Sequence, residues 1–186
     1  MANATGRHIA LIRGINVGRA KRVAMADLRA LVAELGYGDV RTLLNSGNLV
    51  FTVAAKSPGD PAGRIERAIA ERLGVQARVT LLTATELAAA VAAHPLSAVA
   101  ADPSRLLVAV PATTAELAQL RPLTAREWAP EAFALGARVA YLWCAGGILE
   151  SPLAKEVGRI LGDAVTSRNW ATITKLHTLA RPSAGL

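Results

Sequence analysis

Two polar stretches that interrupt apolar runs near the amino terminus carry residue types that could bind an anion. The first is residues 13–22, and the second is residues 45–48, which read Asn-Ser-Gly-Asn. Glycine lets a backbone approach a ligand closely and turn its N–H groups toward it. Arginine and lysine add positive charge, while asparagine and serine add neutral donors and acceptors. The two stretches predict a site for a phosphate or a carboxylate, formed by Arg13, Gly14, Asn16, Gly18, Arg19, Lys21, Asn45, Ser46, Gly47 and Asn48.

The positive charge of the chain is concentrated around the first of these stretches. The 186 residues include 21 Lys and Arg against 14 Asp and Glu, which gives a net charge of +7. From Arg7 to Arg29 there are six basic residues and one acid, Asp27. Such a local positive field attracts phosphate esters, nucleotides or nucleic acid. A coding bias toward alanine and arginine is the alternative explanation of the total charge, and it carries no functional meaning.

Hydrophobic periodicity and turn residues predict two consecutive β-α-β-β-α-β units. Strands are predicted in the first half at residues 8–13, 40–44, 49–53 and 77–82, with helices at residues 25–35 and 61–73. Strands are predicted in the second half at residues 106–110, 131–135, 139–143 and 164–166, with helices that start near Thr113 and Ser151. A connecting helix starts at the capping box of residues 83–86, and a closing helix follows Asn169.

This order of elements is the ferredoxin-like arrangement. We therefore expect an α+β protein whose two ferredoxin-like halves, residues 1–82 and 105–186, pack into one globule. A connecting helix and linker at residues 83–104 join them, and the second half ends in a C-terminal helix.

The predicted topology brings the two polar stretches together. In a β-α-β-β-α-β unit the chain runs up the first strand, back along the helix and up the second strand. The loop after the first strand and the hairpin between the second and third strands must then lie at the same end of the sheet. That loop also leads into a helix amino terminus, which favours an anion.

Each part of this candidate site also has a purely structural interpretation. The tetrapeptide Asn-Ser-Gly-Asn is typical of a hairpin turn. The spacing from Gly14 to Gly18 matches neither the Walker A motif nor the dinucleotide-binding fingerprint. Arg19 and Lys21 also fit an ordinary solvated surface, so the prediction depends on the convergence of the parts.

A second candidate site consists of Ser167, Arg168 and Asn169, at the predicted junction between the last strand and the closing helix. In the functional interpretation, Ser167 and Arg168 face a ligand above the helix amino terminus. In the structural one, Asn169 is the N-cap of the helix and Trp170 packs into the core.

The sequence carries no recognisable catalytic or metal-binding signature. His8, His94 and His177 are isolated from one another, without the spacing of metal ligands. The single cysteine, Cys144, is interpreted as a small core residue, and Trp128 as part of the core or of an interface. We predict no metal, no cofactor and no disulfide, and whether the chain is an enzyme stays open.

The amino-terminal residues lack the hydrophobic region of a signal peptide, and no apolar run approaches the ~18 residues of a membrane span. A chain with one cysteine fits a reducing compartment. We therefore expect a soluble cytoplasmic protein that does not contact a membrane.

Three segments resemble the signatures of one protein family. They read Leu-Ile-Arg-Gly-Ile-Asn-Val-Gly at residues 11–18, Leu-Asn-Ser-Gly-Asn-Leu-Val-Phe at residues 44–51 and Ser-Arg-Asn-Trp-Ala-Thr-Ile-Thr-Lys-Leu at residues 167–176. With them the chain is similar to a bacterial family, the domain of unknown function 1697. The resemblance spans nearly the whole chain and implies a cytoplasmic α+β protein of two ferredoxin-like parts, without a settled activity. The chain departs from the family pattern where Arg19 replaces a second glycine and Ala24 replaces a proline.

Three functions are compatible with these observations. The first is binding of a phosphate-bearing ligand, either a nucleotide or a nucleic acid, at the basic loop. The second is an enzyme that acts on a small anionic substrate in the same cleft, clamped by Arg13 and Arg168 and oriented by Asn16, Ser46 and Asn48. The third is a structural or interaction role as a homodimer, because several predicted strands are apolar on both faces.

Overall fold

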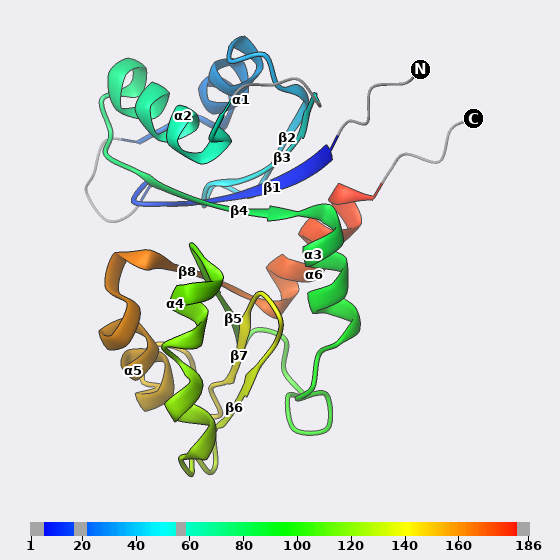
Figure 1. Cartoon of the computed structure of the whole chain (residues 1–186), viewed down its shortest axis with the longest axis vertical. Coiled ribbons are helices and arrows are strands. Elements are labelled where there is room, and N and C mark those ends of the chain that lie inside the picture. Colours follow the sequence, from blue (N-terminus) through cyan, green and yellow to red (C-terminus); the bar gives the residue numbers. More distant parts are fainter. Residues whose placement is uncertain (1–5, 17–21, 55–58, 182–186) are drawn as a thin grey trace. The chain divides into compact units, whose positions relative to one another are not determined.

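The computed structural model describes residues 6–16, 22–54 and 59–181 of the chain, which fall into two compact units (Figure 1). Unit 1 consists of Met1–Thr85 and Leu176–Leu186, and unit 2 consists of Glu86–Lys175. Each unit is built on a four-stranded sheet in which neighbouring strands are antiparallel. The predicted α+β class is confirmed.

Unit 1 has the predicted β-α-β-β-α-β order. Its elements are β1 (Gly6–Arg13), α1 (Met25–Glu34), β2 (Gly38–Leu43), β3 (Asn48–Val53), α2 (Pro61–Ala68) with a following π-helical turn (Ile69–Leu73), and β4 (Arg78–Thr83). The strands lie in the order β2-β3-β1-β4, with β1 between β3 and β4. This is the ferredoxin-like sheet, and α1 and α2 cover the same face of it (Figure 1).

Local signals explain where the helices of unit 1 begin and end. The Asp60 side chain accepts the N–H groups of Ala62 and Gly63 at 3.0 Å each, and Pro61 occupies the first helical turn. Gly74 adopts the left-handed conformation, with φ of 67°, and stops the chain from continuing as a helix. The predicted helix at residues 61–73 is therefore correct in extent, although its last turn is π-helical.

The central strand of unit 1 is buried on both faces. Ile9, Ala10 and Leu11 have 0% exposure and Ile12 has 2% in a single copy of the chain. Apolar strands of this kind were the reason for predicting a homodimer. The homodimer itself stays a prediction.

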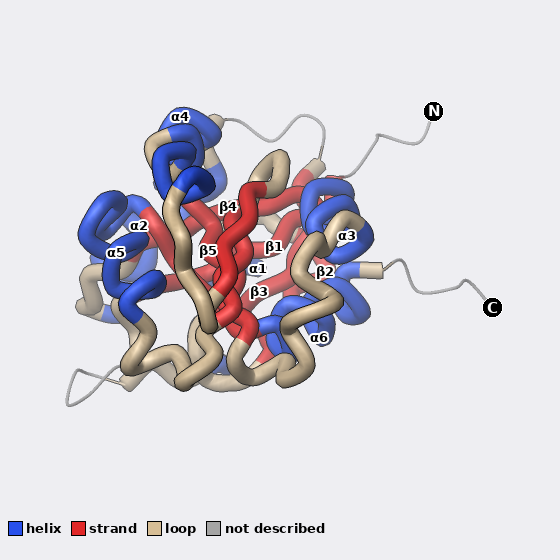
Figure 2. The backbone as a smooth tube through the Cα atoms, turned by 90° about the horizontal axis from the view of Figure 1, so that it is seen from below, coloured by secondary structure: helices blue, strands red, loops and turns tan. Residues whose placement is uncertain are grey.

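Unit 2 repeats the same topology. Its elements are the end of α3 (Ala84–Ala92), β5 (Leu106–Pro111), α4 (Thr114–Ala118), a 3-10 turn (Arg121–Ala125), β6 (Ala132–Leu135), β7 (Ala140–Trp143), α5 (Pro152–Leu161), a second 3-10 turn (Gly162–Ala164), β8 (Val165–Asn169) and the start of α6 (Trp170–Ala180). The strand order β6-β7-β5-β8 matches that of unit 1, strand for strand. Helices α4 and α5 lie on the same face of this sheet (Figure 2).

The predicted caps of unit 2 are present. Thr113 and Glu116 form a capping box, in which each side chain accepts the backbone N–H of the other residue. The Ser151 hydroxyl accepts the Ala154 N–H at 2.9 Å, with Pro152 in the first turn of α5.

The last strand is longer than the sequence suggested. It was predicted to end at Thr166, but β8 continues to Asn169. Ser167, Arg168 and Asn169 pair in register with Ala109, Val108 and Leu107 of β5. Pairing with β5 therefore keeps these residues in the strand, although they are polar. Among the described residues, no helix is long and apolar enough to cross a membrane.

Candidate functional site

The two polar stretches of unit 1 meet at one end of its sheet. The Asn16 side-chain amide donates to the Asn45 carbonyl at 2.9 Å, and the Ile12 N–H donates to the Gly47 carbonyl at 2.7 Å. The juxtaposition predicted from topology is confirmed. We call this region the hairpin end of unit 1, and define it by Arg13, Gly14, Asn16, Arg22, Arg78 and residues 44–48.

Asn16 joins the two ends of the loop after β1, because its side chain bonds to Val23 at the far end. Its Nδ2 donates to the Val23 carbonyl at 3.0 Å, and its Oδ1 accepts the Val23 N–H at 2.8 Å. Asn16 has a φ of 55°, a left-handed conformation that asparagine tolerates better than most residues. Its amide is thus bonded to the protein's own backbone, and it holds Arg22, the neighbour of Val23, next to the hairpin.

The two glycines of the hairpin end allow backbone segments to approach closely. A Cβ at Gly14, where φ is 90°, would lie 2.9 Å from the Gln76 carbonyl oxygen. A Cβ at Gly47, where φ is 73°, would lie 2.8 Å from the Cδ1 of Ile15. Both glycines are therefore needed for the fold, whether or not a ligand binds.

Asn48 is buried in the core of unit 1, although it belongs to a polar stretch. Its exposure is 0%, because it begins β3 between Leu43 of β2 and Leu11 of β1. Its amide donates to the Leu43 carbonyl at 3.0 Å and to the Ser46 hydroxyl at 2.9 Å. These two bonds close the tight turn, which supports the structural interpretation of this side chain. Asn45 and Ser46, by contrast, are exposed.

Two arginines lie side by side at the hairpin end. Arg13 is the last residue of β1, and its cross-strand partner in β4 is Arg78. Arg13 is exposed, and the Arg78 side chain has 72% exposure. Arg22 is exposed as well. The hairpin end therefore brings together Arg13, Asn16, Asn45 and Ser46, as predicted, and adds Arg78, whose place follows from strand register.

Three of the predicted site residues, Gly18, Arg19 and Lys21, lie outside the described residues. Among the described residues, the basic surface of the hairpin end consists of Arg13, Arg22 and Arg78.

The second candidate site belongs to unit 2. The Asn169 side chain accepts the N–H of Thr172 at 3.0 Å and its hydroxyl at 2.8 Å, so it caps α6 as the structural interpretation predicted. Arg168 donates to the Ser167 carbonyl at 2.8 Å and to the Thr166 hydroxyl at 3.2 Å. Burial lowers the pKa of Arg168 to about 10, so its guanidinium remains charged at neutral pH. Ser167 lies beside it in β8, half-buried.

His94 lies beside two aromatic rings of unit 2 and is tilted against both. Its ring centroid lies 4.4 Å from that of Trp170 and 5.6 Å from that of Tyr141. Its Nδ1 accepts the Leu96 N–H at 3.4 Å, an arrangement that protonation of Nδ1 would remove. Burial lowers the pKa of His94 below its ordinary 6.5. The fold therefore favours the neutral ring.

This shift predicts a stability that depends on pH. The unfolded chain binds a proton at His94 more readily than the folded chain does, so stability is full above pH 6.5 and falls as the pH drops below it. We expect the urea midpoint to decrease between about pH 7.5 and pH 5.5. His94→Phe, which keeps an aromatic ring at this position but cannot bind a proton, should show a smaller decrease of the urea midpoint. An equal decrease in both proteins would show that other groups cause it.

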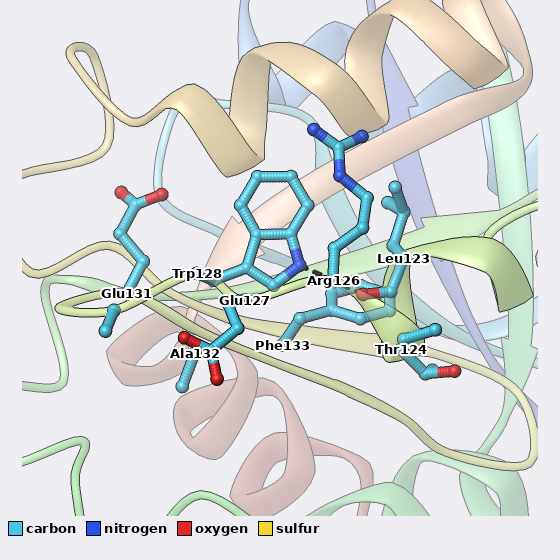
Figure 3. A pocket seen from close by; sticks show the side chains of 10 residues that line it. Leu123, Thr124, Arg126, Glu127, Trp128, Glu131, Ala132 and Phe133 are labelled. Atoms are coloured by element: carbon cyan, nitrogen blue, oxygen red, sulfur yellow. Dashed lines mark hydrogen bonds between the residues drawn. The ribbon is translucent and has the colours of Figure 1, made fainter.

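A hollow of about 370 Å³ opens in unit 2, lined by residues 123–129 and 131–133 (Figure 3). Trp128, interpreted from the sequence as core or interface, stands in it between Arg126 and Glu131 (Figure 3). The Arg126 guanidinium lies 4.5 Å from the centre of the Trp128 ring. Sequence reasoning missed this hollow, because its only local signal is one tryptophan among charged residues.

Metal and thiol chemistry find little support in the part of the chain that the structure describes. No three His, Cys, Asp or Glu side chains there lie close enough to hold a metal ion. Cys144 is buried, as predicted, and burial raises the pKa of its thiol. A thiol with a raised pKa is a poor nucleophile at neutral pH.

The two sheets have the same ferredoxin-like strand order, so the chain is an α+β protein of two similar units. The chain belongs to the family described as protein of unknown function DUF1697, which matches residues 6–141. This range includes the segments at residues 11–18 and 44–51, while the segment at residues 167–176 lies beyond it.

One solved structure similar to this chain is that of the conserved bacterial protein SP0830 from Streptococcus pneumoniae. The two share 22% sequence identity, with a TM-score of 0.73 over 96% of this chain and 100% of that one. At this identity the likeness shows the fold alone. No curated protein matches the chain.

Proposed function

We propose that the protein binds a phosphate-bearing ligand, a nucleotide or a nucleic acid, at the hairpin end of unit 1. The observation that carries this proposal is the cross-strand pairing of Arg13 with Arg78, beside the loop that Asn16 fastens. Arg22, also exposed, adds a third positive charge next to that loop.

Electrostatics support an anionic ligand at this place. Arginine stays protonated at all ordinary pH values, and like charges directly opposite each other on neighbouring strands are destabilising. Glu66 lies 3.6 Å from the Arg78 guanidinium, and its other carboxylate oxygen accepts the Val79 N–H at 2.7 Å. One carboxylate therefore serves both this ion pair and the backbone. An anion that binds here would meet the positive charges of both Arg13 and Arg78.

The scaffold also supports binding. Asn16 makes three hydrogen bonds that join the loop to Val23 and to the hairpin. Residues that are held in place before binding lose less conformational entropy on binding, and Asn16 and Val23 are held in this way.

The enzymatic alternative lacks a comparable observation. It required Asn16 and Asn48 to orient a substrate, yet both side-chain amides are bonded to the protein's own groups. Binding is therefore the function that the described residues support best.

The test is binding as a function of salt, with two kinds of probe. The first is a labelled DNA duplex of about 20 base pairs, titrated between about 50 and 200 mM salt. Each neutralised phosphate contributes about −0.9 to the log–log slope, so three arginines predict a slope of about −2 to −3. The second probe is ATP, which identifies a nucleotide ligand if the duplex binds without measurable affinity.

Arg13→Gln should reduce the slope for the duplex by about 1, or weaken ATP binding, because it removes one phosphate contact. The matched control is Arg41→Gln, which removes one positive charge from β2, where Asp39 already pairs with Arg41 at 2.8 Å. Equal losses in the two variants would contradict a local site, and no binding of either probe would contradict the proposed function.

A further inference from the structure

We infer that the hollow of unit 2 binds a small organic cation, a guanidinium or ammonium group carried on an aliphatic stem. This inference concerns a surface other than the hairpin end and does not depend on the proposed function.

The hollow already contains the arrangement that such a cation would need. The Arg126 guanidinium lies over the Trp128 ring at 4.5 Å, and Glu156 holds it through a hydrogen bond of 2.9 Å. A cation over an indole is stabilised by the electrons of the ring face, most strongly where water is partly excluded. The Arg126 guanidinium thus already covers one face of the Trp128 ring, and a ligand cation would bind beside this pair.

Two further carboxylates line the hollow. Glu127 is exposed and extends away from Arg126 toward Ala132 (Figure 3). Glu131 accepts the Leu153 N–H at 3.0 Å, and a carboxylate has room for additional donors. A cation in the hollow would thus meet carboxylates other than the one that holds Arg126.

The charge balance favours a cation over an anion. Arg159 and Arg126 both donate hydrogen bonds to Glu156 and hold its pKa at about 2, and the lining of the hollow itself carries Arg126 against Glu127 and Glu131. Glu127 and Glu131 then leave the hollow negative, in a chain whose net charge is +7. A positively charged ligand is therefore attracted here, although it is repelled by the chain as a whole.

The apolar groups suit an aliphatic stem. Trp128 and Phe133 supply ring surface (Figure 3), while Leu123 beside them is buried, at 2% exposure. The Trp128 indole N–H donates to the Leu123 carbonyl at 3.0 Å, so it is not available as a donor to an anion. A volume of about 370 Å³ lies within the range of small-molecule sites.

The test uses butylguanidinium as the probe and butylurea as its neutral counterpart of the same shape. The indole N–H resonance of Trp128, assigned from the variant Trp128→Phe, reports on the hollow directly. We expect a saturable shift of this resonance with butylguanidinium and none with butylurea. Glu127→Gln should weaken the binding about two- to fivefold, because it removes one exposed ion pair.

The matched control is Glu150→Gln, since Glu150 is an exposed carboxylate outside the hollow, paired with Lys155 at 3.5 Å. This variant should bind the probe as the unaltered protein does. A shift caused equally by butylurea, an affinity unchanged in Glu127→Gln, or the lack of any saturable shift would each overturn the inference. Because Glu127 is exposed, its replacement leaves folding intact, and the result bears on binding alone.

Discussion

Replacing Asn48 by aspartate is expected to lower the free energy of unfolding by about 2–4 kcal/mol. Asn48 is fully buried, and its amide donates both to the Leu43 carbonyl and to the Ser46 hydroxyl. Aspartate has the same shape but no amide donor, so a negative carboxylate would face the Leu43 carbonyl without water to screen it. The measurement is equilibrium unfolding in urea at neutral pH.

Asn45→Asp is the matched control for this prediction. It makes the same chemical change three positions earlier in the same hairpin. The Asn45 side chain is exposed, and the bond from Asn16 goes to the Asn45 backbone carbonyl, which the substitution keeps. We expect an effect within about 0.5 kcal/mol. Similar losses in the two variants would mean that burial of Asn48 is not what makes it important.

Replacing Gly47 by alanine is expected to destabilise the protein by about 2–4 kcal/mol. Two effects add at this position. The φ of 73° is unfavourable for any residue with a Cβ, and the new Cβ would lie 2.8 Å from Ile15 Cδ1 and 2.9 Å from Ile12 Cβ. Both neighbours are core residues with little room to move, at 3% and 2% exposure. Thermal or urea unfolding measures the loss.

Gly59→Ala separates these two effects. Gly59 has a similar φ of 77°, but a Cβ there would meet nothing within 4 Å. Its replacement should cost only the backbone strain, about 1–2 kcal/mol. If Gly47→Ala cost no more than Gly59→Ala, the close approach of the hairpin to β1 would not be a source of stability.

Much of the fold could be predicted because local signals and topology agree. The Asp60–Pro61 and Ser151–Pro152 pairs start helices where the sequence suggested, and Gly74 ends one. The β-α-β-β-α-β order alone was enough to place Asn16 next to the hairpin, which its 2.9 Å bond to Asn45 confirms.

The parts of the candidate site that could not be predicted depend on strand register and on burial. Arg78 faces Arg13 only through the antiparallel pairing of β4 with β1, and nothing near Arg78 in the sequence marks it as a neighbour. Asn48 is buried because a strand flanks it on each side, which a polar tetrapeptide does not reveal. Likewise, β8 extends to Asn169 because β5 offers backbone partners for three polar residues.

The hairpin end of unit 1 is easier to recognise from the sequence than the hollow of unit 2, for a physical reason. At the hairpin end, charge and turn residues are contiguous in sequence, so the region is visible as a motif. The hollow of unit 2 is formed by a 3-10 turn, the loop after it and the first residues of β6. Its members are also close in sequence, but no run of charge, glycine or turn residues marks them, and the Arg126 guanidinium comes to lie on the Trp128 ring only in the folded chain.

The most direct test of the anion site is a titration of the isotope-labelled protein with inorganic pyrophosphate, followed through the backbone amide resonances. We expect saturable shifts that are largest at Gly14, Asn16, Gly47 and Arg78, and weaker binding in Arg13→Gln. Saturable shifts centred on other residues, or no shift at the hairpin end of the folded protein, would contradict it.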